Sequence, residues 1–125
     1  MKELTRAEEE IMQVLWRLKK GVVRDVIAAL PEPKPAYNTV STVIRILEKK
    51  GFVDHEAYGK THLYFPLVAR DDYRRQSLRS LMGRYFNGSF EQMVSFFAKE
   101  ENLSLREVDD LMSHLKDELN PDDDV

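Results

Sequence analysis

The segment Pro35–Gly51 constrains the fold of this chain more than any other, because its side chains divide into two faces at helical spacing. One face is apolar and consists of Ala36, Val40, Val43, Ile44 and Leu47. A second face has hydrogen-bonding or cationic side chains and no carboxylate: Asn38, Ser41, Thr42, Arg45 and Lys49. A helix in a DNA major groove must offer donors to bases and phosphates and must avoid acids. The segment therefore predicts a recognition helix, and the alternative is an ordinary surface helix of a small α domain.

The residues before this segment predict two further helices. Thr5 and Glu8 have the spacing of a capping box and begin an amphipathic helix. Trp16 is expected to be a packing anchor, and Gly21 is suited to end the helix in the left-handed conformation. The buried stripe of this helix is predicted to be Ala7, Ile11, Val14, Leu15 and Leu18. A shorter apolar helix over 22–30 follows, and prolines separate it from the recognition helix.

After the recognition helix, alternating segments over 52–57 and 61–65 predict two strands joined at Tyr58–Lys60. Such a hairpin places Lys60 at its tip, where it either contacts a phosphate or the minor groove or is an exposed turn lysine. Three helices followed by a hairpin is the order of elements in a winged helix-turn-helix domain. We predict this DNA-binding domain for residues 1–70, in a chain that is mainly α with a small β-hairpin wing.

Residues 71–125 predict a helical domain of three helices that ends in a disordered acidic tail. Three short helices cannot bury all of their large apolar side chains alone, and each buried side chain contributes about 1.5–3 kcal/mol. We therefore expect a second copy to cover them across a two-fold interface, with folding back onto the N-terminal domain as the alternative. The predicted interface residues are Leu78, Leu81, Met82, Tyr85, Phe86, Met93, Phe97, Leu111 and Leu115.

The charge of the chain is unevenly distributed. The formal net charge is −3, yet residues 34–75 hold eight cations against five anions, and residues 99–125 hold three against ten. Because contacts with phosphates depend on the local face that meets them, the acidic end does not exclude a DNA partner.

Several other classes of protein are disfavoured. The chain has no cysteine, no phosphate-cradling glycine loop and no nucleophile–base pair, so we expect neither an enzyme nor a cofactor. His55 and His62 have no third ligand nearby in the sequence, which favours exposed strand histidines over a metal site. No apolar run approaches the ~20 residues that cross a bilayer, and we expect no signal segment, so the predicted location is the cytoplasm.

Motifs along the chain resemble the penicillinase repressor family, the BlaI/MecI/CopY-type winged-helix regulators. Thr5 and Glu8 followed by 11–16 resemble the family's opening helix, and 38–42 with 47–51 resemble its recognition helix. Residues 84–89 and 93–96 are similar to its C-terminal dimerisation helices. The resemblance covers residues 3–119. It implies a homodimeric transcriptional repressor that binds a dyad-symmetric operator.

The resemblance also implies roles for particular residues. Thr39, Ser41 and Thr42 match groove-facing positions of the family, and Tyr37, Asn38 and Arg45 fill neighbouring positions. A membrane-bound sensor protease pathway would cause cleavage between Phe96 and Phe97, where well-known members have asparagine before the cut. The cysteine-rich motif of copper-responsive relatives is absent from this chain.

These residues suggest a steric repressor in which the helix of each subunit enters a major groove. Arg45 or Asn38 would read base edges, because arginine suits guanine and asparagine suits adenine in bidentate geometry. Thr39, Ser41, Lys49 and Lys60 would mostly contact phosphates. The alternative is a winged-helix module that binds another protein and does not bind DNA sequence-specifically.

Overall fold

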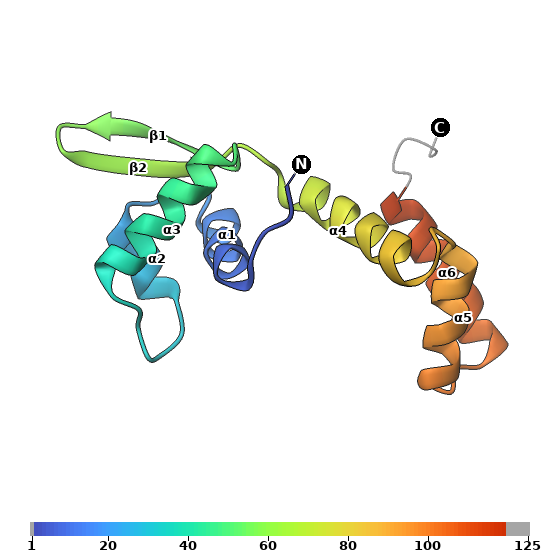
Figure 1. Ribbon diagram of the computed structural model, residues 1–125. Helices are drawn as coiled ribbons and strands as arrows, with labels where there is room; N and C mark the ends of the chain where they lie inside the picture. The colour runs from blue at the N-terminus through green and yellow to red at the C-terminus, as the bar shows by residue number, and fades with distance from the viewer. Residues whose placement is uncertain (1, 120–125) are drawn as a thin grey trace. The chain divides into compact units, whose positions relative to one another are not determined.

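The computed structural model describes residues 2–119. Within that range lie six helices and one hairpin: α1 (Arg6–Leu18), α2 (Val23–Ala29), α3 (Tyr37–Lys49), β1 (Val53–Tyr58), β2 (Thr61–Pro66), α4 (Arg70–Tyr85), α5 (Phe90–Glu100) and α6 (Leu105–Leu119) (Figure 1). The predicted class, mainly α with a small hairpin, is confirmed. The chain forms two compact units that divide after Tyr73, which we call the N-terminal unit and the C-terminal unit.

Helix α1 begins at the predicted capping box. The Thr5 hydroxyl accepts the backbone N–H of Glu8 at 3.2 Å, and the Glu8 carboxylate accepts the N–H of Thr5 at 2.7 Å. The end of the helix differs from the prediction: Lys19, with φ of 72°, has the left-handed conformation, and Gly21 does not. Gly21 instead forms an antiparallel bridge with Tyr64 of β2.

The buried face of α1 is centred differently from the predicted stripe. Ile11, Val14 and Leu15 are buried as predicted, whereas Ala7 is exposed. Leu18 is also exposed, and Met12 is fully buried. The stripe is displaced because α3 and β2 both pack against α1, and Met12 belongs to the core that these elements share.

The core of the N-terminal unit lies where α1, α2 and α3 meet the hairpin. Its largest fully buried side chains are Phe52, Met12, Leu15, Ile44, Leu47, Val26, Val40 and Val53. Trp16 packs at the edge of this core, and its indole N–H donates to the carbonyl of Val68 at 2.8 Å. Trp16 is thus the packing anchor that its context predicted.

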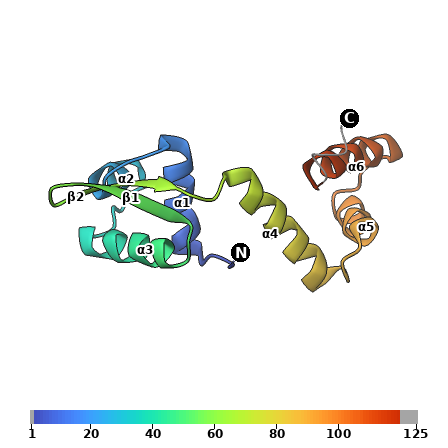
Figure 2. The ribbon, with the colours of Figure 1, turned by 90° about the horizontal axis from the view of Figure 1, so that it is seen from above.

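The hairpin pairs in antiparallel register from Val53 with Pro66 to Tyr58 with Thr61. Its two-residue turn places Gly59 first, with φ of 63°, a conformation that favours glycine. The strands run back along α3 from its C-terminal end, and the turn lies beyond its N-terminal end (Figure 2). Lys60 is therefore at the exposed tip, as predicted.

The C-terminal unit has a small core in which Met82 and Met93 are buried against Leu78, Phe86 and Phe90. The Ser89 hydroxyl caps α5 by accepting the N–H of Gln92 at 3.1 Å. The Ser104 hydroxyl caps α6 in the same way at the N–H of Glu107. The predicted disordered tail lies outside the described residues. In the part of the chain that is described, no helix combines the length and apolar character needed to span a membrane.

Candidate nucleic-acid interface

The outward face of α3 carries most of the residues predicted to contact DNA. Asn38, Thr39, Thr42 and Lys49 are exposed, opposite the buried Val40, Ile44 and Leu47. Glu48, the one acidic residue of α3, is only half-exposed and contacts the hairpin through His55. The exposed residues of α3 therefore include no carboxylate, as a helix that approaches phosphates requires.

A polar groove of about 380 Å³ lies between α2, α3 and β2, and we call it the cationic groove. Each wall supplies one cation: Arg24 from α2, Arg45 from α3 and Lys60 from the hairpin turn. The rest of the lining consists of Val22, Val23, Tyr37, Ser41, Thr61, His62 and Tyr64. None of these described lining residues is acidic, so the groove offers positive charge and polar groups together.

Tyr64 forms an inner wall of this groove. It is 4% exposed, and burial is the main cause that raises the pKa of its hydroxyl. The negative charge of Glu48 raises this pKa further, whereas the positive charge of Arg45 opposes the rise. The positive charge of Arg45 is therefore near enough to Tyr64, a wall of the groove, to affect the pKa of its hydroxyl.

The structure changes the role of two positions. Ser41 was predicted to lie on the polar face, but it is only 9% exposed and lines the cationic groove. Arg24 was not predicted as a site residue, yet it contributes a wall of the groove. Its sequence position offered one signal, because the helix before a recognition helix commonly crosses the DNA backbone.

A cluster of polar side chains holds the hairpin to the end of α3. The Glu48 carboxylate accepts a hydrogen bond from Nδ1 of His55, and the backbone N–H of His55 donates to Asp54 at 2.8 Å. His62 stacks on His55 with ring centroids 4.1 Å apart. One potential metal-ligand atom from each of Glu48, Asp54 and His55 lies within 4.8 Å of the others. Two carboxylates therefore lie close to His55, although His62 is not in this group.

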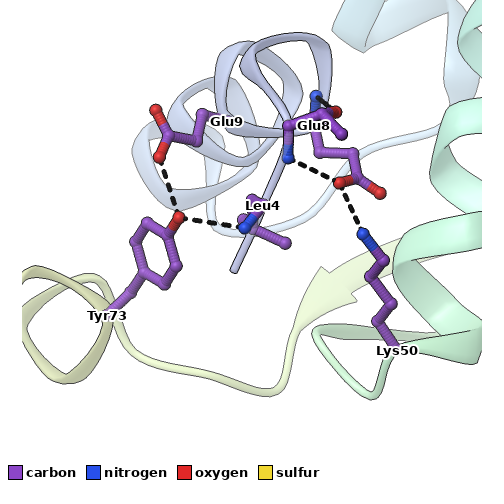
Figure 3. A network of polar contacts seen from close by, with 6 residues as sticks. Leu4, Glu8, Glu9, Lys50 and Tyr73 are labelled. Atoms are coloured by element: carbon purple, nitrogen blue, oxygen red, sulfur yellow. Dashed lines mark hydrogen bonds and ion pairs between the residues drawn. The ribbon is translucent and has the colours of Figure 1, made fainter. Parts of the chain in front are cut away.

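A second polar network lies at the start of α1 (Figure 3). The ammonium of Lys50, directly after α3, donates to the Glu8 carboxylate at 2.7 Å. The hydroxyl of Tyr73 donates to Glu9 at 2.8 Å and accepts the N–H of Leu4 at 3.3 Å. These contacts connect α3 and the start of α4 to α1, so they hold the recognition face in place.

The C-terminal unit has an apolar groove of about 650 Å³, lined by Leu81, Tyr85, Phe86, Met93, Val94, Phe96, Phe97 and Leu111. Several of these side chains are largely exposed: Tyr85 by 70%, Phe96 by 57% and Phe97 by 45%. Two predicted interface residues, Met82 and Met93, are already buried in their own unit. The side chain of Leu115 lies outside the described part of the structure.

Comparison with known proteins identifies the family. The model of the penicillinase repressor family matches residues 4–117. The chain belongs to the penicillinase repressor family. The resemblance deduced from the motifs is thus confirmed over almost the whole chain.

Among relatives of the penicillinase repressor family, the methicillin resistance regulatory protein MecI of Staphylococcus aureus strain N315 is 29% identical over 114 residues. That alignment covers 90% of this chain and 93% of the relative. The penicillinase repressor of Bacillus licheniformis is 29% identical over 119 residues, which cover 94% of this chain and 93% of that relative. The solved DNA binding domain of the repressor BlaI has a TM-score of 0.50 and 30% identity, and it covers 58% of this chain and 94% of its own. These relatives are repressors and regulators, which confirms the expectation that the chain is not an enzyme.

Proposed function

We propose that this member of the penicillinase repressor family is a homodimer that represses transcription by binding a dyad-symmetric DNA operator. The observation that carries the proposal is the carboxylate-free exposed face of α3 beside the cationic groove. The aligned relative whose structure is solved is the DNA binding domain of a repressor, which supports the same role for this N-terminal unit. Occupation of the operator would block transcription sterically, in the cytoplasm where the DNA lies.

The outward face of α3 is the part that would enter the major groove. Asn38 is exposed near the first turn of the helix, where recognition helices commonly contact base edges. Its amide can pair with the N6 and N7 positions of adenine, a contact that contributes about 1–3 kcal/mol of discrimination. Thr39, Thr42 and Lys49 would position the helix on bases and phosphates.

The apolar groove of the C-terminal unit is the surface that a second copy would cover. Its exposed aromatic side chains are Tyr85, Phe96 and Phe97, and exposed apolar area of this kind commonly marks an interface. A dimer would present two α3 helices to two half-sites, as helix-turn-helix dimers do. Loss of the dimer would leave one half-site contact and weaken operator binding.

Cleavage between Phe96 and Phe97 is a second part of the proposal, as the inactivation step. Both residues lie in the middle of α5 and are exposed, but a helical segment must open before a protease can bind it in extended form. Cutting there would divide the helix that carries the proposed interface. A membrane-bound sensor pathway would supply the signal.

Selection from a random duplex library tests the DNA-binding proposal. We expect the purified full chain to enrich sequences with an inverted repeat, and to bind them with an affinity that falls steeply as salt increases. Two copies of the chain should bind each duplex. If the chain enriches no sequence and has no duplex affinity even at low salt, the proposal is wrong and the protein-binding module is favoured.

A further inference from the structure

We propose that the cationic groove is a seat for one backbone phosphate of the DNA, held by Arg24, Arg45 and Lys60. This inference rests on the proposed function and makes it more specific. It assigns Arg24 as a DNA-contacting residue. It also assigns Arg45 to a phosphate instead of to a guanine, in contrast to the role expected from the sequence.

The first argument is electrostatic. The three cations come from three different elements and line one groove with no described acidic residue among them. None of the three takes part in an ion pair with a described residue. Like charges that line one groove repel one another, and the repulsion is relieved when an anion lies between them.

The second argument is a hydrogen-bonding group without a partner. Ser41 lines the groove and is nine-tenths buried, and its hydroxyl has no hydrogen bond with a described residue. No fully buried side-chain nitrogen or oxygen lacks a partner in the described part of the chain, so the Ser41 hydroxyl must reach solvent. The surface on which it opens is the groove. A phosphate oxygen is an acceptor that this hydroxyl can serve.

The third argument concerns the direction of Arg45. Tyr37, Ser41 and Arg45 are spaced four residues apart on α3, so they form one row along the helix, and all three line the groove. Asn38 and Thr42 form the next row and do not line it. A helix in the major groove has a phosphate backbone passing along its side, and the hairpin borders α3 on that side. Arg45 thus lies toward the backbone.

The test measures how binding depends on salt for the duplex selected above and for an unrelated duplex of the same length. Each phosphate contact contributes about 0.9 to the slope of log affinity against log salt. In a dimer, Arg24→Gln and Arg45→Gln should each reduce that slope by up to about 1.8, the amount expected if both subunits lose their one phosphate contact. Each should weaken binding to both duplexes by a similar factor.

Arg6→Gln is the matched control, because Arg6 is an exposed arginine of the same unit that does not line the groove. We expect its slope to equal that of the wild type. Thermal melting of each variant would confirm that the fold is intact. Arg24 and Arg45 are both exposed, so neither change should unfold the unit.

The outcomes separate this inference from the proposed function. If the wild type binds no duplex, the proposed function fails. If the wild type binds its selected duplex and both variants keep the wild-type slope, the phosphate seat alone is wrong. A loss of affinity in Arg45→Gln that is roughly tenfold or more for the selected duplex, but small for the unrelated one, would restore Arg45 as a base reader. If inorganic phosphate stabilises the wild type and not Arg24→Gln while the slopes are unchanged, the groove binds free phosphate and the DNA assignment is wrong.

Discussion

The ammonium nitrogen of Lys50 lies 2.7 Å from a carboxylate oxygen of Glu8, so the residue that follows α3 is ion-paired with the first turn of α1. Glu8 is buried, and burial by itself would raise its pKa. The hydrogen bond from Lys50 and those from Thr5 outweigh that effect, so the pKa of Glu8 lies below its ordinary value. The pair is therefore stabilised in its charged form.

We predict that Glu8→Gln lowers the free energy of unfolding by about 1–3 kcal/mol at neutral pH, because it leaves the Lys50 ammonium half-buried without its counter-charge. A depressed folded-state pKa stabilises the native state above the unfolded pKa, and this contribution disappears as pH falls through the folded pKa. The difference between wild type and variant should therefore narrow in acid. Urea unfolding followed by the fluorescence of Trp16 at several pH values measures it.

Glu10→Gln is the control for that experiment. Glu10 also pairs with a cation, Arg6, at 3.7 Å, but both side chains are largely exposed. Exposed pairs contribute little, so we expect the free energy of unfolding to fall by less than about 0.5 kcal/mol. Equal losses for the two variants would contradict the role assigned to Glu8.

We predict that Tyr73→Phe destabilises the N-terminal unit by about 0.5–1.5 kcal/mol. The change removes the hydroxyl that contacts Glu9 and Leu4. It keeps the ring, whose centroid lies 5.8 Å from the ring centroids of Trp16 and Phe52. The loss should be visible as a lower urea midpoint for the Trp16 signal.

Tyr58→Phe provides a comparison for this change. The Tyr58 hydroxyl also donates to a carboxylate, that of Glu56 at 2.7 Å, but Tyr58 is 61% exposed. Water can replace that bond, so its removal should have little effect on the midpoint. If Tyr58→Phe were as destabilising as Tyr73→Phe, burial would not be the deciding factor.

We predict that Glu48→Gln loosens the hairpin from α3 without unfolding the unit. The change removes the charge that accepts the His55 hydrogen bond, and the two side chains are 31% and 28% exposed, so the loss should be about 0.5–1 kcal/mol. Amide hydrogen exchange should become faster in β1 and β2 and stay unchanged in α1. Unaltered exchange in the hairpin would show that this contact does not hold it.

The elements of the N-terminal unit could be predicted from sequence because their signals are local. The Thr5–Glu8 capping box and the glycine turn of the hairpin each lie within four residues, and the periodicity of α3 identified Val40, Ile44 and Leu47 as core. Local patterns decide which residues form an element. They also locate its apolar side approximately.

The features that could not be predicted from the sequence depend on contacts between different helices and strands. Glu8 and Lys50 are 42 positions apart, and nothing in either segment indicates the pairing. Ser41 lies at the border of the polar face of α3, and the packing of α2 and β2 beside it decides that it is buried. Arg24 joins the cationic groove for the same reason. The periodicity of a helix shows which side of the helix a side chain lies on, but it does not show which other element covers that side chain.

The exposed aromatic residues of α4 and α5 provide the last prediction. Tyr85→Asp combined with Phe97→Asp should convert the proposed dimer to a monomer in sedimentation experiments, because a charge placed in an apolar interface is costly to desolvate. Both residues are exposed in the single chain, so the helical content of the C-terminal unit should be maintained. Leu105→Asp is the matched control: Leu105 is 86% exposed and does not line the apolar groove. We expect that control to remain dimeric. A wild type that sediments as a single copy, or a dimer that survives the double substitution, would contradict an interface at this groove.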